Sequence, residues 1–494
     1  MRPILCGLET EYGLEIEGAT PKDQSDHSRA LVESHQGPCF VGWDYRHESP
    51  RSDLRGFQLE RLAYDARDAV YDRGRAMLPA EVERADRVLA NGARFYNDHG
   101  HPEYATPECL SSRELALHDA AGERIVARAA RAYAERLGRE VRVYKNNSDG
   151  HGASYGTHES YLVPRELGFA RLYRAVTPML VVRSLLCGAG KACSEQGTPS
   201  RFQASQRAEF LTQPANAETL ANRPVFNTRD EPHASPGEWI RLHVIAGDAN
   251  MSARCTRRKV DLVKTAIALE ELGLAPEWDL LNPGAAIEAT SKELGEARLA
   301  LAGDAWASPL EILQSYLDAA LQAFGDEDPY EAELASNSLE CLRLVELLPE
   351  RGREFSLEVE WAAKLGMIEG FFEAEGSEFE GETAASLDLA FHLLSEDEGL
   401  YPALVSEGIV APLPDTAEVG ARELAVFEPT RALARSVAVT RFPEAIAETS
   451  WGSLTLHTLT GPRKLVLDPD RNYPDSLRDS QSADELAQAL ESTK

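Results

Sequence analysis

Alternation of side chains along three short segments predicts strands that each carry polar groups on one face. Successive strand residues point to opposite faces, so Glu9 and Glu11 share a face within residues 5–13. The same rule aligns further polar groups in residues 92–98 and 241–245: Arg94, Tyr96 and Asp98 in the first, Arg241 and His243 in the second. Carboxylates, a phenol and cations are costly to bury in a core, but they suit a hard cation and a polyphosphate. The pattern therefore indicates a nucleotide-using enzyme.

Helical spacing of apolar residues predicts one long helix over about 112–137. It predicts five more at about 169–187, 255–273, 309–324, 329–348 and 354–374, and strand-like segments at 139–146, 154–163 and 239–247. Residues 20–90 are polar and broken by Pro and Gly, which we interpret as an irregular insertion that is functional or partly disordered. Strands mixed with helices without regular βαβ alternation favour an α+β fold.

A change in composition at 412–415 predicts a linker between two domains. The first is a large domain over 1–411, and the second is a small C-terminal domain over 416–494. In the small domain we expect a helix near 429–449, a strand pair at about 451–460 and 463–468, and a polar tail. The dense Glu and Asp of residues 326–400 are interpreted as solvated helix faces and loops.

Composition narrows the functional class. The chain has 494 residues and a formal net charge of −30, which argues against nonspecific binding to nucleic acid or anionic membranes. No apolar run of about 18 residues or secretory signal is evident. Seven scattered cysteines without CxxC spacing predict reduced thiols rather than a zinc cluster. These features favour a cytoplasmic enzyme.

The densest block of reactive side chains is residues 98–109. A strand that ends at Asp98, a Gly/Pro turn and a return through Glu103 would bring two carboxylates together, and the alternative is an ordinary surface turn. His99 and His101 resemble a metal motif, but we interpret them as solvated turn residues because Mg²⁺ prefers oxygen ligands.

Two further polar stretches are less specific. Residues 144–161 form a glycine-rich turn that leads into a strand, which fits close approach to a ligand or a plain hairpin. Arg241 suits a phosphate and His243 a metal, although a single histidine is more often structural. Residues 187–191 lack the P-loop spacing, so we interpret them as the turn that ends a helix.

Taken together, these segments resemble the motif series of the Pup ligase and depupylase family, within the glutamine-synthetase-like carboxylate–amine ligases. The matching segments run in order along the chain: 7–13, 91–109, 144–161, 205–207, 227–233 and 241–250. Residues 43–57, inside an insertion of about 36–80, are similar to the loop that distinguishes the depupylase, or Pup deamidase, from the ligase.

The resemblance implies an antiparallel sheet cradle, packed by helices, that holds ATP and Mg²⁺, with a small C-terminal domain closing one side. It implies metal ligands at Glu9, Tyr96, Glu103, His158 and His243. It implies nucleotide-binding positions at Glu11, Arg94, Thr106, Arg241 and Trp451, and candidate substrate contacts at Arg207 and Arg229. Asp98 would be the catalytic aspartate.

Three functional hypotheses follow. The first is an ATP/Mg²⁺-dependent depupylase-like hydrolase that cleaves the side-chain amide or isopeptide of a C-terminal Gln or Glu on a Pup-type tag. The second is a divergent paralogue that transfers phosphoryl groups to a small molecule, or hydrolyses ATP, without Pup; the acidic net charge fits poorly with docking an acidic tag. The third is a nucleotide-sensing partner protein without catalysis, which the retained acidic residues disfavour.

Overall fold

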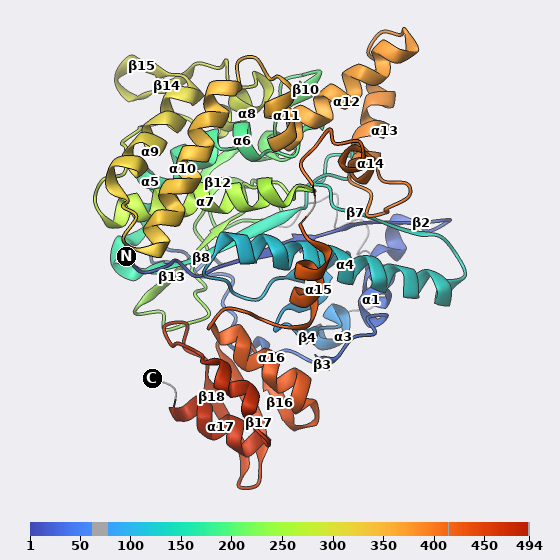
Figure 1. Cartoon of the computed structure of the whole chain (residues 1–494), viewed down its shortest axis with the longest axis vertical. Helices are drawn as coiled ribbons and strands as arrows, with labels where there is room; N and C mark the ends of the chain where they lie inside the picture. Colours follow the sequence, from blue (N-terminus) through green and yellow to red (C-terminus); the bar gives the residue numbers. More distant parts are fainter. Residues whose placement is uncertain (62–77, 413, 493–494) are drawn as a thin grey trace.

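A seven-stranded sheet forms the centre of the molecule (Figure 1). The computed structural model describes residues 1–61, 78–412 and 414–492. Every neighbouring pair in the sheet is antiparallel. The strands follow the order β13 (Trp239–Val244), β8 (Thr157–Pro164), β1 (Cys6–Glu11), β6 (His101–Ala105), β5 (Arg94–Asp98), β4 (Arg87–Leu89) and β3 (Cys39–Val41). This confirms the expected antiparallel cradle of an α+β fold.

Strand β1 lies between β8 and β6, and its register places the polar groups. Glu9 lies opposite His158 of β8, and Glu11 lies opposite Glu103 of β6. On its other face, Leu8 joins the main hydrophobic core, while Thr10 donates a hydrogen bond to Asp119 of helix α4 (Ser112–Leu137) at 3.1 Å. One face of β1 is therefore fixed by packing, and the other carries the acidic side chains.

Helices pack against the apolar side of the sheet and form the main hydrophobic core with it (Figure 1). The long helix α4 has the bounds that periodicity predicts, because the Ser111 hydroxyl accepts from the amides of Arg113 and Glu114 and Gly138 ends it at a φ of 68°. The other helices of the large part are α5 (Gly168–Val182), α6 (Ser184–Cys187), α7 (Ala253–Glu271), α8 (Pro283–Lys292), α9 (Pro309–Ala323), α10 (Pro329–Leu347), α11 (Arg353–Glu358), α12 (Glu360–Glu375), α13 (Gly381–Phe391) and α14 (Leu400–Ser406). None of the described helices is long and apolar enough to cross a membrane.

A C-terminal module packs below the sheet in Figure 1 around its own apolar core. It contains α16 (Arg431–Arg441), a three-stranded sheet of β16 (Ile446–Thr449), β17 (Ser453–Thr458) and β18 (Gly461–Val466), and α17 (Ala483–Ser492). Trp43 and Val88 of the large part join this core. The preceding helix α15 (Thr416–Leu424) instead packs on α4, through the ion pair of Glu423 with Arg124 at 2.8 Å. The predicted division at 411–416 stays a proposal.

Several expectations were wrong in detail. Residues 20–90 are not simply irregular: they hold α1 (Gln24–Glu33), β3, α3 (Ala80–Arg84) and β4, although part of the predicted insertion, 62–77, lies outside the described residues. The helix expected over 354–374 is two helices, α11 and α12, because Val359 between them is extended. The helix expected to reach 449 ends at Arg441, since Phe442 leaves the helical region and Pro443 follows. The strand pair has a third strand, β16, and the polar tail contains α17.

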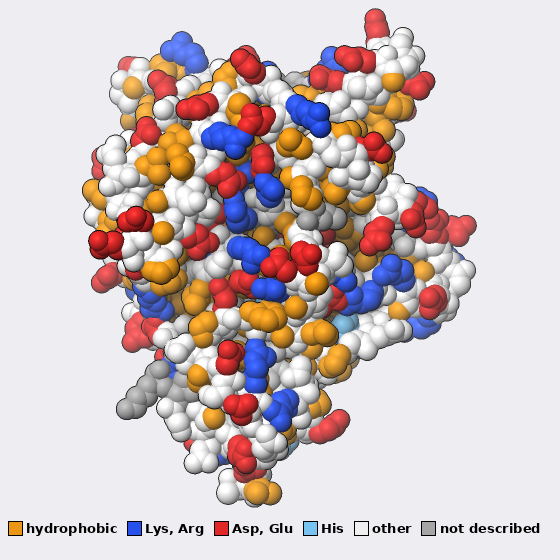
Figure 2. Space-filling view, viewed as in Figure 1, with side chains coloured by type: hydrophobic (Ala, Val, Ile, Leu, Met, Phe, Trp, Pro, Cys, Tyr) orange, Lys and Arg blue, Asp and Glu red, His pale blue; other side chains and the backbone are white. Residues whose placement is uncertain are grey.

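Surface charge is mixed on the face that Figure 2 shows. Acidic and basic side chains alternate across the helical layer rather than separating into fields of one sign. This mixed face fits a net charge, −30 for the whole chain, that serves solubility.

The module is tied to the sheet by Glu108, a buried carboxylate just beyond β6. Arg431 Nε donates to it at 2.6 Å, and Arg435 of the same helix α16 also donates to it. These two guanidinium groups hold the pKa of Glu108 below its usual range, against the opposing effect of burial. Because the three side chains are largely buried, the pairs are protected from solvent screening.

We predict that Glu108→Gln lowers the free energy of unfolding by about 3 kcal/mol, because it leaves two buried guanidinium groups without a countercharge. Urea titration followed by circular dichroism measures the loss. Glu418→Gln is the matched control: its pair with Arg113 is exposed, so it should cost less than about 1 kcal/mol. Equal losses in the two variants would contradict the role of Glu108.

Candidate active site

Two groups of potential metal ligands lie side by side on the polar face of β1 and its neighbours. Glu9, His158 and His243 form the first group, and Glu11, Asp98 and Glu103 form the second. Within each group the candidate ligand atoms lie within 4.8 Å of one another. Alternation along β1 puts both glutamates on this face. Glu9 joins the first group opposite β8 and Glu11 the second opposite β6, and the neighbouring strands supply the other members.

The first group contains two neutral imidazoles, His243 buried and His158 half-buried. The rings of His158 and His243 are 5.2 Å apart and nearly perpendicular, and His243 Nε2 lies 3.8 Å from a carboxylate oxygen of Glu9. Burial, reinforced by nearby arginines, keeps the pKa of both histidines well below the usual value. Neither ring nitrogen of His243 has a hydrogen-bond partner among the described residues. A neutral imidazole with an unused lone pair beside a carboxylate fits a metal ion.

The second group concentrates negative charge. Burial raises the pKa of Glu103 well above its usual value, and the charges of Asp98 and Glu11 raise it further. The pKa of Glu11 is also raised, mainly by burial. Asp98 differs, because His99, Arg84 and other nearby cations outweigh its burial and lower its pKa. Three clustered carboxyl groups with opposed pKa shifts suit a hard divalent cation and acid–base work.

Hydrogen bonds fix this second group. Tyr96 of β5 donates its hydroxyl proton to Glu103, and the amide of Gly156 donates to Glu11 at 2.9 Å. Arg84 Nη1 lies 3.1 Å from Asp98 Oδ1. Each carboxylate therefore has one partner that sets its orientation.

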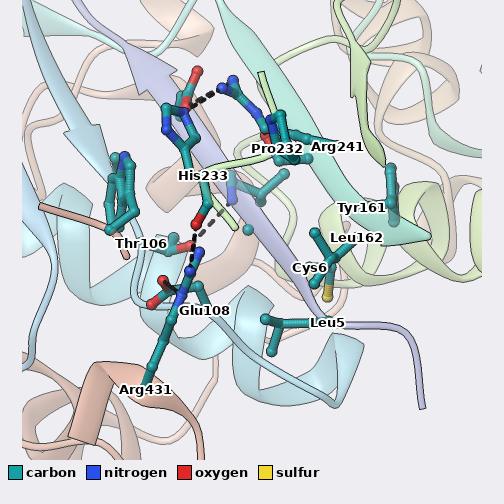
Figure 3. A pocket seen from close by; sticks show the side chains of 16 residues that line it. Leu5, Cys6, Thr106, Glu108, Tyr161, Leu162, Pro232, His233, Arg241 and Arg431 are labelled. Carbon is teal, nitrogen blue, oxygen red and sulfur yellow. Dashed lines mark hydrogen bonds and ion pairs between the residues drawn. The ribbon is translucent and has the colours of Figure 1, made fainter. Parts of the chain in front are cut away.

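A pocket opens beside the first group, between the sheet and the C-terminal module (Figure 3). Glu9, Thr106, Arg241 and Trp451 line it, together with residues that include His233, Glu108 and Arg431. The Arg241 guanidinium contacts Glu9 at 3.3 Å, the Ser160 hydroxyl at 3.0 Å and His233 at 2.8 Å. Its lining combines apolar side chains such as Trp451 with the cationic Arg241 and Arg431, a composition that suits a nucleotide.

Arginines gather next to both groups: Arg241 pairs with Glu9, whereas Arg207 and Arg229 each keep at least one unsatisfied guanidinium nitrogen among the described residues. The guanidinium of Arg207 is fully buried, and its Nε and Nη1 atoms have no hydrogen-bond partner in the described part of the chain. Burial, with the charge of Arg223 beside it, lowers the pKa of Arg207 to about 10. The pKa of Arg229 is also lowered, by burial and by the charge of Arg241. Crowded, under-paired guanidinium groups provide a site for phosphate or carboxylate oxygens.

The structure brings together most of the residues that the sequence singled out, but in a different grouping. The five expected metal ligands fall into both groups: Tyr96 and Glu103 lie with Asp98 and Glu11 rather than with Glu9. Arg94 does not line the pocket; its guanidinium pairs with Asp86 at 2.7 Å and lies 3.9 Å from the Tyr96 ring. The ligand roles of all these residues stay predictions.

Two turn assignments have different outcomes. His101 is not merely solvated, since its ring packs on Tyr155 at 4.2 Å and its Nδ1 lies 3.2 Å from the carbonyl oxygen of Tyr12. His99 is mostly exposed at a φ of 47°, as expected for a turn residue. Residues 187–191 do form the end of a helix, where the Gly188 amide donates to the Ser184 carbonyl.

Sequence reasoning missed Arg84 and Glu108, which contact the two ends of the site. Arg84 lies in the polar region 20–90, which Pro and Gly interrupt, so no periodicity marks it. Glu108 was inside the densest block of reactive residues, but only the packing of α16 against the sheet identifies its partners.

Comparison with known proteins adds independent findings. The family model for Pup-ligase protein matches residues 4–455. The depupylase of Acidothermus cellulolyticus is 35% identical over 510 residues, covering 98% of this chain and 99% of that protein. The Pup deamidase/depupylase of Mycobacterium tuberculosis is 35% identical over 469 residues, covering 91% and 90%. The Pup–protein ligase of Mycobacteroides abscessus is 35% identical over 404 residues, covering 78% and 87%.

Two solved structures share the fold. The structure of the Pup ligase PafA in complex with ADP matches with a TM-score of 0.71 and 26% identity, covering 88% of this chain and 96% of that one. The complex between Pup and its ligase PafA matches with a TM-score of 0.76 and 24% identity, covering 99% and 91%.

We predict that Glu103→Gln stabilises the metal-free protein and weakens its response to Mg²⁺. At pH 7.5 the wild-type carboxylate is held among like charges, so the amide should raise the Tm in EDTA by about 2 °C. The folded-state pKa of Glu103 is raised, so the wild type regains this stability when Glu103 is protonated as the pH falls towards 5. The difference in Tm between Glu103→Gln and the wild type should then shrink.

Differential scanning calorimetry with and without Mg²⁺ checks this prediction. Glu17→Gln, at an exposed position, is the control and should leave both melting temperatures unchanged. A Glu103→Gln variant that melts below the wild type in EDTA would show that the carboxylate is not under repulsion.

Proposed function

This chain belongs to the Pup-ligase protein family, and on that premise we propose that it is an ATP- and Mg²⁺-dependent depupylase and Pup deamidase. It would hydrolyse the side-chain amide or isopeptide at the C-terminal Gln or Glu of a Pup-type tag. One observation carries the proposal: Asp98 lies within one carboxylate group with Glu11 and Glu103, and Glu9 of the neighbouring group lines a pocket together with Arg241 and Arg431. The relative named depupylase also aligns with 98% of this chain, whereas the ligase relative aligns with 78%.

The residues present fit a metal–nucleotide assembly. The first group offers a carboxylate and two neutral imidazoles, the second group offers three carboxylates, and Arg207, Arg229 and Arg241 offer cations for phosphate oxygens. The relative whose structure was solved with ADP supports nucleotide binding in this fold. When bound, Mg²⁺ and the nucleotide would neutralise charge that develops on phosphoryl or carbonyl oxygens.

Asp98 is the residue that would act on the scissile bond. Its pKa is lowered by nearby cations, so it is ionised at neutral pH and ready to attack the side-chain carbonyl or to activate a water molecule for that attack. Burial and its acidic neighbours raise the pKa of Glu103, so it binds a proton more readily than Asp98 does. Two carboxyl groups with opposed pKa shifts allow one to act as a base and the other as an acid.

A second candidate activity is Pup–protein ligation. Relatives named Pup–protein ligase reach the same 35% identity over a shorter alignment. In that direction, Asp98 would accept a proton from the incoming lysine after a glutamyl phosphate has formed. The small-molecule phosphotransferase is not favoured, because a relative that matches almost the whole chain is named for depupylation.

Incubation of the purified protein with ATP, Mg²⁺ and a Pup–lysine conjugate tests the proposal. We expect release of Pup, and at least a 100-fold slower release by Asp98→Asn, because the amide cannot act as base or nucleophile. Asp318→Asn, at an exposed position of α9, is the control and should match the wild type. Release that persists undiminished in Asp98→Asn would refute the catalytic role, and ligation without release would favour the second candidate.

Nucleotide turnover, followed separately, tests the metal site. Glu9→Ala should abolish it, because the change removes a carboxylate from the first group. Isothermal titration calorimetry with ATP and Mg²⁺ should show the same loss of binding, while Glu17→Ala should retain both. Unchanged turnover in Glu9→Ala would contradict the assignment of Glu9 as a ligand.

A further inference from the structure

Arg84 is the last residue of the short helix α3, and it contacts the carboxylate on which the proposed reaction depends. Its Nη1 lies 3.1 Å from Asp98 Oδ1. The other oxygen, Oδ2, lies 3.8 Å from His99 Nε2, which is beyond hydrogen-bond distance. Arg84 therefore contacts one carboxylate oxygen, and the second has no hydrogen-bond partner in the described part of the chain.

The position of Arg84 is built into the fold. The side-chain amide of Asn97, on β5, donates to the carbonyl oxygen of Glu83 at 2.9 Å and so ties the end of α3 to the strand that carries Asp98. The Arg84 guanidinium also lies over two aromatic rings, 5.6 Å from that of Tyr45 and 5.9 Å from that of Tyr96. This hydrogen bond to the backbone and the two cation–π contacts hold the Arg84 guanidinium in place.

The local charge balance explains why a cation is needed at this point. Asp98 shares its group with Glu11 and Glu103, so repulsion would turn its carboxylate away from them. Arg94, the neighbouring arginine on β5, is already paired with Asp86 and stacked on Trp43 at 4.4 Å. His99 is mostly exposed. Within residues 1–61, 78–412 and 414–492, Arg84 is thus the guanidinium in direct contact with Asp98.

We propose that Arg84 is a positioning residue that orients the Asp98 carboxylate through Oδ1 and leaves Oδ2 to attack the substrate or activate water. This inference rests on the proposed function. A misplacement of the reacting group by about 1 Å can cost about 100-fold in rate, which sets the size of the expected effect.

The test measures release of Pup from a Pup–lysine conjugate by Arg84→Met, Arg84→Lys and Arg84→Ala. We expect kcat to fall by about 100-fold in Arg84→Met and by less in Arg84→Lys, with KM and the Kd for ATP changed by less than about threefold. Millimolar guanidinium chloride should restore part of the rate of Arg84→Ala and none of the rate of Asp98→Asn. Arg131→Ala is the control, since this arginine is exposed on α4.

The outcomes distinguish a failure of the positioning role of Arg84 from a failure of the proposed depupylase activity. A wild-type protein that does not release Pup refutes the proposed function, whatever the variants do. If the wild type is active, an unchanged or increased kcat in Arg84→Met overturns the inference. So does a fall in kcat that comes with an equal loss of ATP affinity and no rescue by lysine or guanidinium, because that result describes a structural residue. The Tm of each variant, measured in parallel, identifies any loss of fold.

Discussion

The pairing of β1 with β6 and β8 is the constraint on which the site depends. Side chains alternate along a strand, so a slip of one residue would move Glu9 and Glu11 to the core face and replace them with Leu8 and Thr10. The register is held by backbone bonds at both edges, from the Thr106 amide to Leu8 and from the Glu11 amide to Gly156, each 2.8 Å long. Burial of the opposite face against α4 makes the alternative register costly. The same packing that stabilises the fold therefore also sets the geometry of the acidic groups.

The site is electrostatically incomplete as the chain alone builds it. Elsewhere the protein pairs its buried charges, as where Lys145 donates to Asp119 at 2.7 Å and Arg183 to Glu159 at 2.6 Å. On the polar face of the sheet, by contrast, Glu103 is surrounded by like charges, and the buried Arg207 retains unpaired donors among the described residues. An excess of carboxylates beside an excess of guanidinium groups matches a cation bound to a polyanion, since each excess then has a partner. This separation of charge is stronger support for a metal–nucleotide assembly than any single residue.

Sequence periodicity predicted the long helix α4 and the polar faces of β1, β5 and β13, because these depend only on local alternation and capping. It did not predict that the expected metal ligands divide into two groups. That division follows from the order of the strands, which places β6 on one side of β1 and β8 on the other, and strand order is not a local property. The edge strand β3 and helix α1 were missed for a related reason. β3 has only three residues and α1 is largely polar, so both are stabilised by packing on the large sheet rather than by their own pattern. Arg84 could not be identified from the sequence because its partner, Asp98, lies 14 positions further along the chain and comes close only in the fold.

The C-terminal module belongs to the same physical unit as the pocket. Trp451 lines the pocket from the module, and its ring meets that of Trp43 from the large part at 5.0 Å, edge to face. Trp43 stacks on Arg94, which in turn stacks on Tyr96, whose hydroxyl donates to Glu103. Contiguous packing thus runs from the pocket wall to the second carboxylate group, and Glu108 anchors the module at the other end. A displacement of the module would disturb both the pocket and the support of Tyr96, so the two parts of the site require a single docked arrangement of sheet and module.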